Sequence, residues 1–281
     1  LAYLGAGSAD TVHLMAEAMR YAYVDRNSAL GDPDFVDNPV SKFLDKAYAA
    51  EIRSKIDPFR AGVSQDLMPK GFGESNETTH YSIIDKDGNA VAVTYTLNGS
   101  FGAGVVAPGT GVLLNNEMDD FTQKPGVPNL YGLVQGEANA IQPKKTPLSS
   151  MSPTVVAKDG KPFMVIGSPG GSRIITITME TILNVIDHRM DIQEAIDAPR
   201  VHHQWLPDTL YVEPHGLSPD TLKLLDGMGY HLDVSEDDGT WGQAAGILVG
   251  GKSLGEIEKG GGARYNGAMD SRSGSGEALG Y

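Results

Sequence analysis

The spacing of apolar residues along the chain changes at residue 78, and this change limits what the chain can fold into. Before residue 78, apolar residues recur every three or four positions, which is typical of helices that bury one face. After it, they alternate with polar residues, which is typical of half-buried β-strands. The two patterns together predict an α+β fold in which helices pack on sheets.

Two helices are expected before the change. The first follows an N-cap at Ser8 and runs to about Asp25, and the second covers residues 42–56. Residues 58–77 are rich in Gly and Pro and indicate a long irregular connection. A connection of that length in a compact protein calls for a functional reason.

Two β-hairpins of the same kind are expected after residue 78. In the first, residues 81–83 and 91–95 flank an Asp-Gly turn, and in the second, residues 154–157 and 162–167 do the same. Paired hairpins flanked by apolar helices predict stacked sheets with helical layers outside them.

Three more helices are expected, at residues 174–186, 192–198 and 219–227. The first of them is apolar around most of its circumference, which predicts burial on two sides. The tail, residues 250–280, is rich in Gly and Ser and is expected to be mostly loop.

Composition argues against several classes of function. The net charge of −14 would repel nucleic acid and anionic membrane surfaces, and no apolar run reaches the roughly 20 residues that span a bilayer. The absence of cysteine excludes disulfides and thiolate chemistry. His202 and His203 lack the spacing of a helical metal site, and we predict no metal. Because Leu1 is not a methionine and no signal peptide follows it, we expect the chain to be a fragment that begins upstream.

Thr78 and Thr79 stand where the loose connection meets the first strand. A threonine hydroxyl can be activated by the α-amine of its own residue, which requires a cut before that residue. Such an amine titrates at about 7.7–8.0, near working pH. Taken alone, however, a Thr-Thr pair is more often simply the β-branched start of a strand.

Further motifs occupy residues 78–82, 94–98, 114–121, 147–153 and 167–173. In order and spacing they resemble the small subunit of bacterial γ-glutamyltranspeptidases. The resemblance continues through residues 198–205 to the end of the chain, and residues 1–77 resemble the end of the large subunit.

This resemblance implies the N-terminal-nucleophile hydrolase fold, an αββα sandwich that is partial here because the first half of the large subunit is absent. Residues 1–77 would belong to the large subunit and residues 78–281 to the small one. They would form a heterodimer after the precursor cuts itself between Glu77 and Thr78.

The resemblance also implies the catalytic groups. Thr78 would be the nucleophile for the cut and for a γ-glutamyl ester, and Thr96 would hydrogen-bond its hydroxyl. Gly170 and Gly171 would present backbone N–H groups to the oxyanion, a role that suits glycines ahead of a helix N-terminus. Without the family, Thr96 would be an ordinary strand residue and Gly-Gly an ordinary turn.

Substrate contacts are implied in the same way. The α-ammonium of the substrate would be held by Asn98, Glu117 and Asp120, and its α-carboxylate by Ser149 and Ser150. Tyr131 would lie in a lid loop over the substrate. Without the family, these residues would be an acidic turn, loop serines and a surface aromatic. The arginine with which the family grips the α-carboxylate has no match in residues 1–77.

The expected activity is transfer and hydrolysis of γ-glutamyl groups from glutathione and related amides, with an amino acid, a peptide or water as acceptor. No cofactor is implied, and bacterial relatives suggest a periplasmic or secreted protein. Two alternatives stay open. One is a glutaryl or cephalosporin-type acylase of the same family, which has less need of Glu117 and Asp120, and the other is a truncated, catalytically silent homologue.

Overall fold

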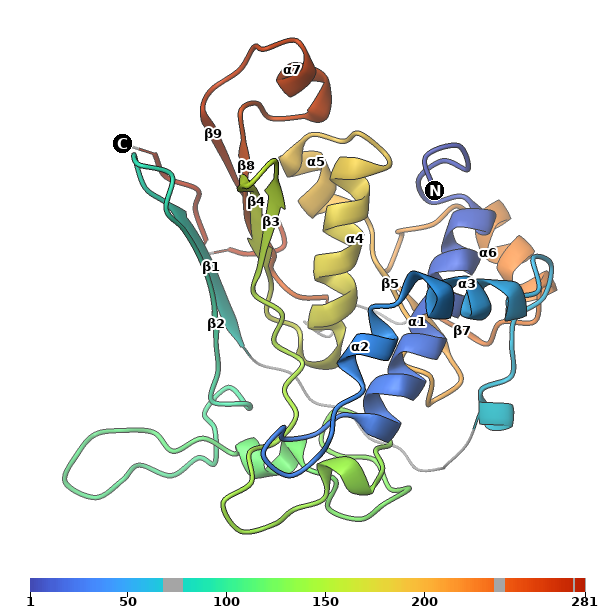
Figure 1. Ribbon diagram of the computed structural model, residues 1–281, viewed down its shortest axis with the longest axis vertical. Helices are drawn as coiled ribbons and strands as arrows, with labels where there is room; N and C mark the ends of the chain where they lie inside the picture. Colours follow the sequence, from blue (N-terminus) through green and yellow to red (C-terminus); the bar gives the residue numbers. More distant parts are fainter. Residues whose placement is uncertain (68–77, 235–240, 275, 281) are drawn as a thin grey trace.

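The computed structural model describes residues 1–67, 78–234, 241–274 and 276–280. Its centre is an antiparallel four-stranded sheet (Figure 1), in the order β3 (Thr154–Lys158), β4 (Lys161–Gly167), β8 (Ala245–Val249) and β9 (Tyr265–Met269). Strand β4 is buried without alternation from Phe163 to Gly167, because both faces of the sheet are covered there.

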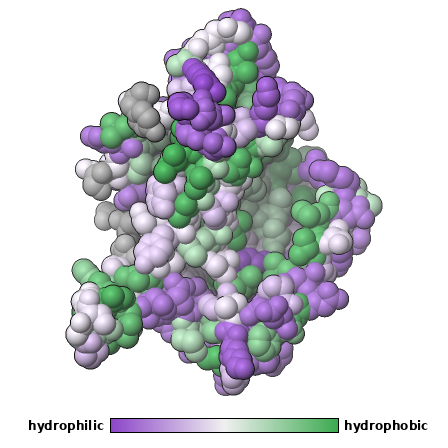
Figure 2. Space-filling model, turned by 60° about the vertical axis from the view of Figure 1, so that its left-hand side comes forward, coloured by the Kyte–Doolittle hydropathy of each residue, from purple (hydrophilic) through white to green (hydrophobic). Residues whose placement is uncertain are grey.

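One face of this sheet carries the hairpin of β1 (Thr79–Ile84) and β2 (Ala90–Tyr95), as the sequence predicted. The register pairs Thr79 with Tyr95 and Ile84 with Ala90 around the Asp-Gly turn. The hairpin face that points away from the sheet remains about half exposed although it is apolar (Figure 2); it bears Tyr81, Ile83, Val91 and Tyr95.

Helices α4 (Ile174–Ile186) and α5 (Ile192–Asp197) cover the opposite face of the sheet. Their apolar side chains meet those of β4 and β8 in one buried cluster, which includes Met164, Ile166, Ile177, Ile196 and Leu248. Hairpin, sheet and helices thus form three successive layers, and stacked sheets with a helical layer outside them match the predicted α+β arrangement.

Helix α1 (Ala9–Ala29) lies beyond α4, and Ser8 caps it as predicted. It packs on α6 (Pro219–Gly227) and on a small sheet of β5 (Val201–His202), β6 (Leu210–Val212) and β7 (Leu232–Asp233). Residues on the two sides of position 78 therefore share one core.

One sequence-based prediction was wrong. The single helix expected at residues 42–56 is two helices, α2 (Val40–Phe43) and α3 (Lys46–Lys55), because the Asp45 side chain accepts a hydrogen bond from Ala47 N and caps a new helix. The tail, residues 250–280, is mostly loop in its described part, as predicted, and it also contains the short helix α7 (Leu254–Glu258) and the edge strand β9. Within the described ranges, no helix is long and apolar enough to cross a membrane.

Candidate active site

The hairpin places Thr78 opposite Thr96. Thr79 pairs with Tyr95 in the antiparallel register, so the residues just outside that pair face each other. The Thr78 hydroxyl donates to Thr96 Oγ1 at 3.2 Å, and Thr96 Oγ1 also accepts the Asn98 N–H at 2.8 Å. A short turn at the end of β2 thereby fixes the acceptor beside Thr78.

A small cavity of about 20 Å³ opens at this threonine pair. Its walls come from segments far apart in the chain: Thr78, Thr96, Asn98, Asp120, Tyr131, Ser149, Ser150, Met151, Gly171 and Ile174. The structure thus brings together most of the site residues expected from the sequence. A space of this size holds about one water molecule, so it has to widen to admit a glutamyl group.

A pair of carboxyl groups lies at the 3₁₀ turn Glu117–Asp120. Asp120 lines the cavity and is 8% exposed, and its side chain hydrogen-bonds that of Glu117. Burial raises the pKa of both groups, and for Asp120 the hydrogen bond to Glu117 and the Glu117 charge add to this, so that the pKa of Asp120 is about 8. The pair therefore holds a proton at neutral pH when the cavity is empty.

Tyr131 is buried rather than exposed on a surface loop. Asn129 Oδ1 accepts the N–H groups of Tyr131 and Leu133, which shapes the turn, and the Tyr131 hydroxyl donates to Asn98 O at 3.4 Å. Burial raises its pKa well above the ordinary value, so the phenol stays protonated. In this conformation Tyr131 closes one side of the cavity.

The turn after β4 reaches the cavity at Gly171, whereas Gly170 is not among the lining residues. Gly170 and Gly171 have φ angles of 135° and 53°, which side chains rarely allow, and α4 begins three residues later. Gly242 packs on the turn so closely that a Cβ there would lie 2.4 Å from Pro169 O. The Gln243 N–H donates to Ser168 Oγ, so the segment that follows Trp241 fixes the turn.

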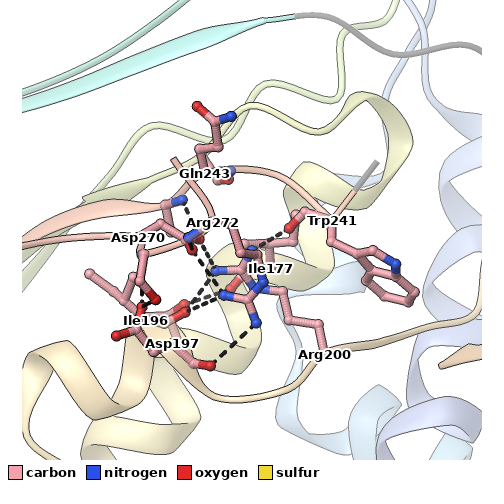
Figure 3. Close-up of polar contacts among 12 residues, drawn as sticks. Ile177, Ile196, Asp197, Arg200, Trp241, Gln243, Asp270 and Arg272 are labelled. Carbon is pink, nitrogen blue, oxygen red and sulfur yellow. Dashed lines mark hydrogen bonds and ion pairs between the residues drawn. The ribbon is translucent and has the colours of Figure 1, made fainter. Parts of the chain in front are cut away.

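That segment is held by two arginines around one buried carboxylate (Figure 3). Arg200 donates to Trp241 O, Ile196 O and Asp270, while Asp270 accepts the Ala244 N–H at 3.0 Å. Arg272 binds the second oxygen of Asp270 at 2.9 Å. This cluster links the end of the chain to the turn that contains Gly170.

Arg26 is a site residue that the sequence analysis missed. It projects from α1, is buried, and donates to Ser150 Oγ at 2.9 Å, while its charge opposes the raised pKa of Asp120. Its only sequence signal is its spacing from Tyr23, which places a charged residue on a buried helix face.

Of the other residues named above, Glu77 lies outside the described residues, and the two histidines are not at the cavity. The side chains of His202 and His203 are fully buried, with hydrogen bonds to Thr176 and to Trp205 N respectively.

Comparison with known proteins decides the family. A model described as Gamma-glutamyltranspeptidase matches residues 1–280. The chain belongs to the γ-glutamyltranspeptidase family.

Three relatives illustrate the match. A "Glutathione hydrolase proenzyme" from a Pseudomonas species is 59% identical over 280 residues, which cover 99% of this chain and 48% of that protein. An acylase proenzyme from another Pseudomonas strain is 43% identical over 203 residues, covering 70% of this chain and 33% of that protein. A crystal structure of a mutant Helicobacter pylori γ-glutamyltranspeptidase superposes with a TM-score of 0.63 and 51% identity, covering 69% of this chain and all of that one.

Membership in the γ-glutamyltranspeptidase family confirms the predicted fold class, the α+β fold of N-terminal-nucleophile hydrolases. The chain spans about half the length of the curated relative from Pseudomonas.

Proposed function

We propose that this chain carries the reaction centre of a γ-glutamyltransferase and glutathione hydrolase that matures by cutting itself between Glu77 and Thr78. One observation carries the proposal: the Thr78 hydroxyl, already hydrogen-bonded to Thr96, opens into a cavity lined by groups suited to an amino-acid head and by a glycine turn. Family membership and the relatives named as proenzymes support it.

The chemistry needs only groups of the chain itself. Once residue 78 is a terminus, its α-amine takes the hydroxyl proton as the oxygen attacks the γ-carbonyl of the substrate. The N–H groups of Gly170 and Gly171 stabilise the oxyanion with help from the α4 dipole. Collapse breaks the amide bond, the departing amine takes the proton, and a γ-glutamyl ester of Thr78 remains. Water or an amino acid then releases the glutamyl group in a second attack.

Glutamyl specificity would come from two sets of polar groups. Asn98 and Asp120 line the cavity and, with Glu117 beside Asp120, would offer an amide oxygen and carboxylates to an α-ammonium group. Ser149 and Ser150, also in the lining, would offer hydroxyls to an α-carboxylate. Tyr131 would have to swing aside for entry and would then exclude water. An acylase taking a side chain without the amino group remains the second candidate, because an acylase proenzyme is 43% identical to this chain.

The same proposal assigns residues 1–77 to the large subunit and residues 78–281 to the small one. They would remain together as a heterodimer, because α1 shares its core with α6 and the small sheet. Export to the periplasm or medium, and the use of glutathione with amino-acid or peptide acceptors, belong to the proposal as well.

Intact mass and paired substrates test this function. The complete reading frame is expressed as wild type and as Thr78→Ala, and the wild type alone is expected to give a fragment beginning at Thr78. The cut protein should hydrolyse a γ-glutamyl anilide faster than a glutaryl anilide, which differs only in the α-amino group. A folded wild type that stays uncut would support a silent homologue, and a preference for the glutaryl anilide would support an acylase.

A further inference from the structure

His80 lies on the same strand face as the candidate nucleophile. Thr78 directly precedes β1 and His80 follows Thr78 by two residues, so extended backbone puts their side chains on one side of the hairpin. His80 is 8% exposed, whereas Tyr81 on the other face is 48% exposed. The imidazole therefore fills the space between the two stacked sheets.

The imidazole ring rests on the backbone of Gly167, the last residue of β4. A Cβ at that position would lie 2.3 Å from His80 Cε1 and 2.5 Å from Nδ1, closer than real Cβ atoms approach. Gly167 directly precedes the turn that contains Gly170 and Gly171. The ring thus sets how near the nucleophile strand comes to the oxyanion turn.

Both ring nitrogens are occupied by hydroxyl groups. Nδ1 lies 2.9 Å from Thr94 Oγ1 and Nε2 lies 3.1 Å from Ser82 Oγ, while Ser82 Oγ donates to Ala245 O at 3.2 Å. Because the Ser82 proton is used on Ala245, Ser82 accepts from the ring. His80 therefore carries its proton on Nε2 and accepts at Nδ1 from Thr94.

Two independent contacts anchor the ring at one place in the sheet. The ring contacts Gly167 directly, and it contacts Ala245 indirectly, through the Ser82 hydroxyl. Gly167 and Ala245 are paired with each other on neighbouring strands. Burial lowers the pKa of His80 to about 4, so the imidazole is neutral at working pH. With both nitrogens occupied, the ring has no free atom to serve as a base.

We propose that His80 is a positioning residue, a neutral spacer that fixes the distance between Thr78 and the turn of Gly170 and Gly171. The inference rests on the proposed function and names a further residue for the same reaction. It acts through its contacts with Gly167, Ser82 and Thr94, and it touches neither substrate nor reacting atoms.

Four variants of the complete protein test the proposal: His80→Ala, His80→Gln, Thr94→Val and Ile83→Ala. His80→Ala removes the ring that acts as the spacer. His80→Gln replaces the ring with an amide that can also donate and accept hydrogen bonds, and Thr94→Val removes only the hydroxyl that bonds Nδ1 of the ring. Ile83 lies on the exposed face of the same strand and serves as the control. Cutting is followed by intact mass, and kcat, KM and the pH profile are measured on fully cut protein with a γ-glutamyl anilide.

His80→Ala is expected to lower kcat about 100-fold, the effect of roughly 1 Å of misplacement, with KM changed less than about threefold and the shape of the pH profile kept. Thr94→Val should lower kcat about tenfold, and His80→Gln should recover at least about tenfold over His80→Ala. Ile83→Ala should match wild type.

Any one of three results would overturn the proposal. The first is that both His80→Ala and Thr94→Val keep kcat within about twofold of wild type. The second is that His80→Ala changes KM alone, and the third is that His80→Ala removes an ionisation from the pH profile. If His80→Ala does not fold, Thr94→Val and His80→Gln decide the question. A wild type that neither cuts itself nor hydrolyses the anilide contradicts the proposed function instead, so the two failures are distinguishable.

Discussion

The carboxyl groups of Glu117 and Asp120 are hydrogen-bonded to each other, an arrangement that requires a proton between them. Burial is the main cause of the raised pKa of both groups, and Arg26 partly offsets it for Asp120, whose pKa is about 8. An arriving α-ammonium group needs the ionised pair, so binding must expel this proton.

We therefore predict that KM falls as pH rises toward about 8. Below that pH the proton competes with the substrate, and KM should increase by up to about tenfold for each pH unit lost. KM for a γ-glutamyl anilide, measured across the range, checks this. Asp120→Asn should give a high KM that varies little with pH, whereas a wild-type KM independent of pH would contradict the shared proton.

Thr96 should matter for both the cut and turnover, because its oxygen accepts the Thr78 hydroxyl proton. Thr96→Val keeps the shape and removes the acceptor, so we expect slower cutting and a kcat lowered by about 10- to 100-fold. Thr96→Ser keeps the hydroxyl and should remain within about threefold of wild type. Equal rates for the two variants would show that the hydroxyl is dispensable.

The hairpin and its consequences could be predicted because their signals are local. Alternation around an Asp-Gly turn gives the strands and their register, and the register alone brings residues 78 and 96 face to face. Helix starts were equally predictable where a capping side chain precedes them, as at Ser8.

Other features depend on tertiary contacts, which one sequence does not reveal. Strand β9 has a single buried side chain, Ala268, and exists because it pairs with β8, so its sequence looks like loop. Arg26 meets Ser150 across 124 positions of sequence, and the cluster around Asp270 joins residues from three regions of the chain. The Leu44–Asp45 break was missed because the capping signal lay inside an apolar helical pattern.

Asp270 should be important for stability. Its side chain is fully buried between Arg200 and Arg272, so Asp270→Asn leaves two guanidinium groups without their shared carboxylate. We expect a loss of about 3–5 kcal/mol in the free energy of unfolding. The matched control is Arg189→Gln, which breaks an ion pair with Glu258. Both side chains of that pair are more than half exposed, so its loss should change the stability little. Urea unfolding of both variants measures the difference, and similar losses would contradict the argument.

Arg26 is expected to support substrate binding without contacting substrate itself. It donates to Ser150 Oγ, which leaves the Ser150 proton free for a carboxylate, and its charge holds down the pKa of Asp120. Arg26→Gln removes both effects.

For Arg26→Gln we therefore expect KM to rise about tenfold, the value of one charge-assisted hydrogen bond, with a smaller change in kcat. The pH at which KM stops falling should also move upward, because Asp120 loses a neighbouring positive charge and holds its proton longer. Arg26→Lys keeps the charge without the guanidinium geometry, so it should restore the pH dependence more fully than KM. These effects are separated by measuring KM as a function of pH for both variants, with Arg189→Gln as the control. If Arg26→Gln raised KM while leaving its pH dependence unchanged, Arg26 would act on Ser150 alone.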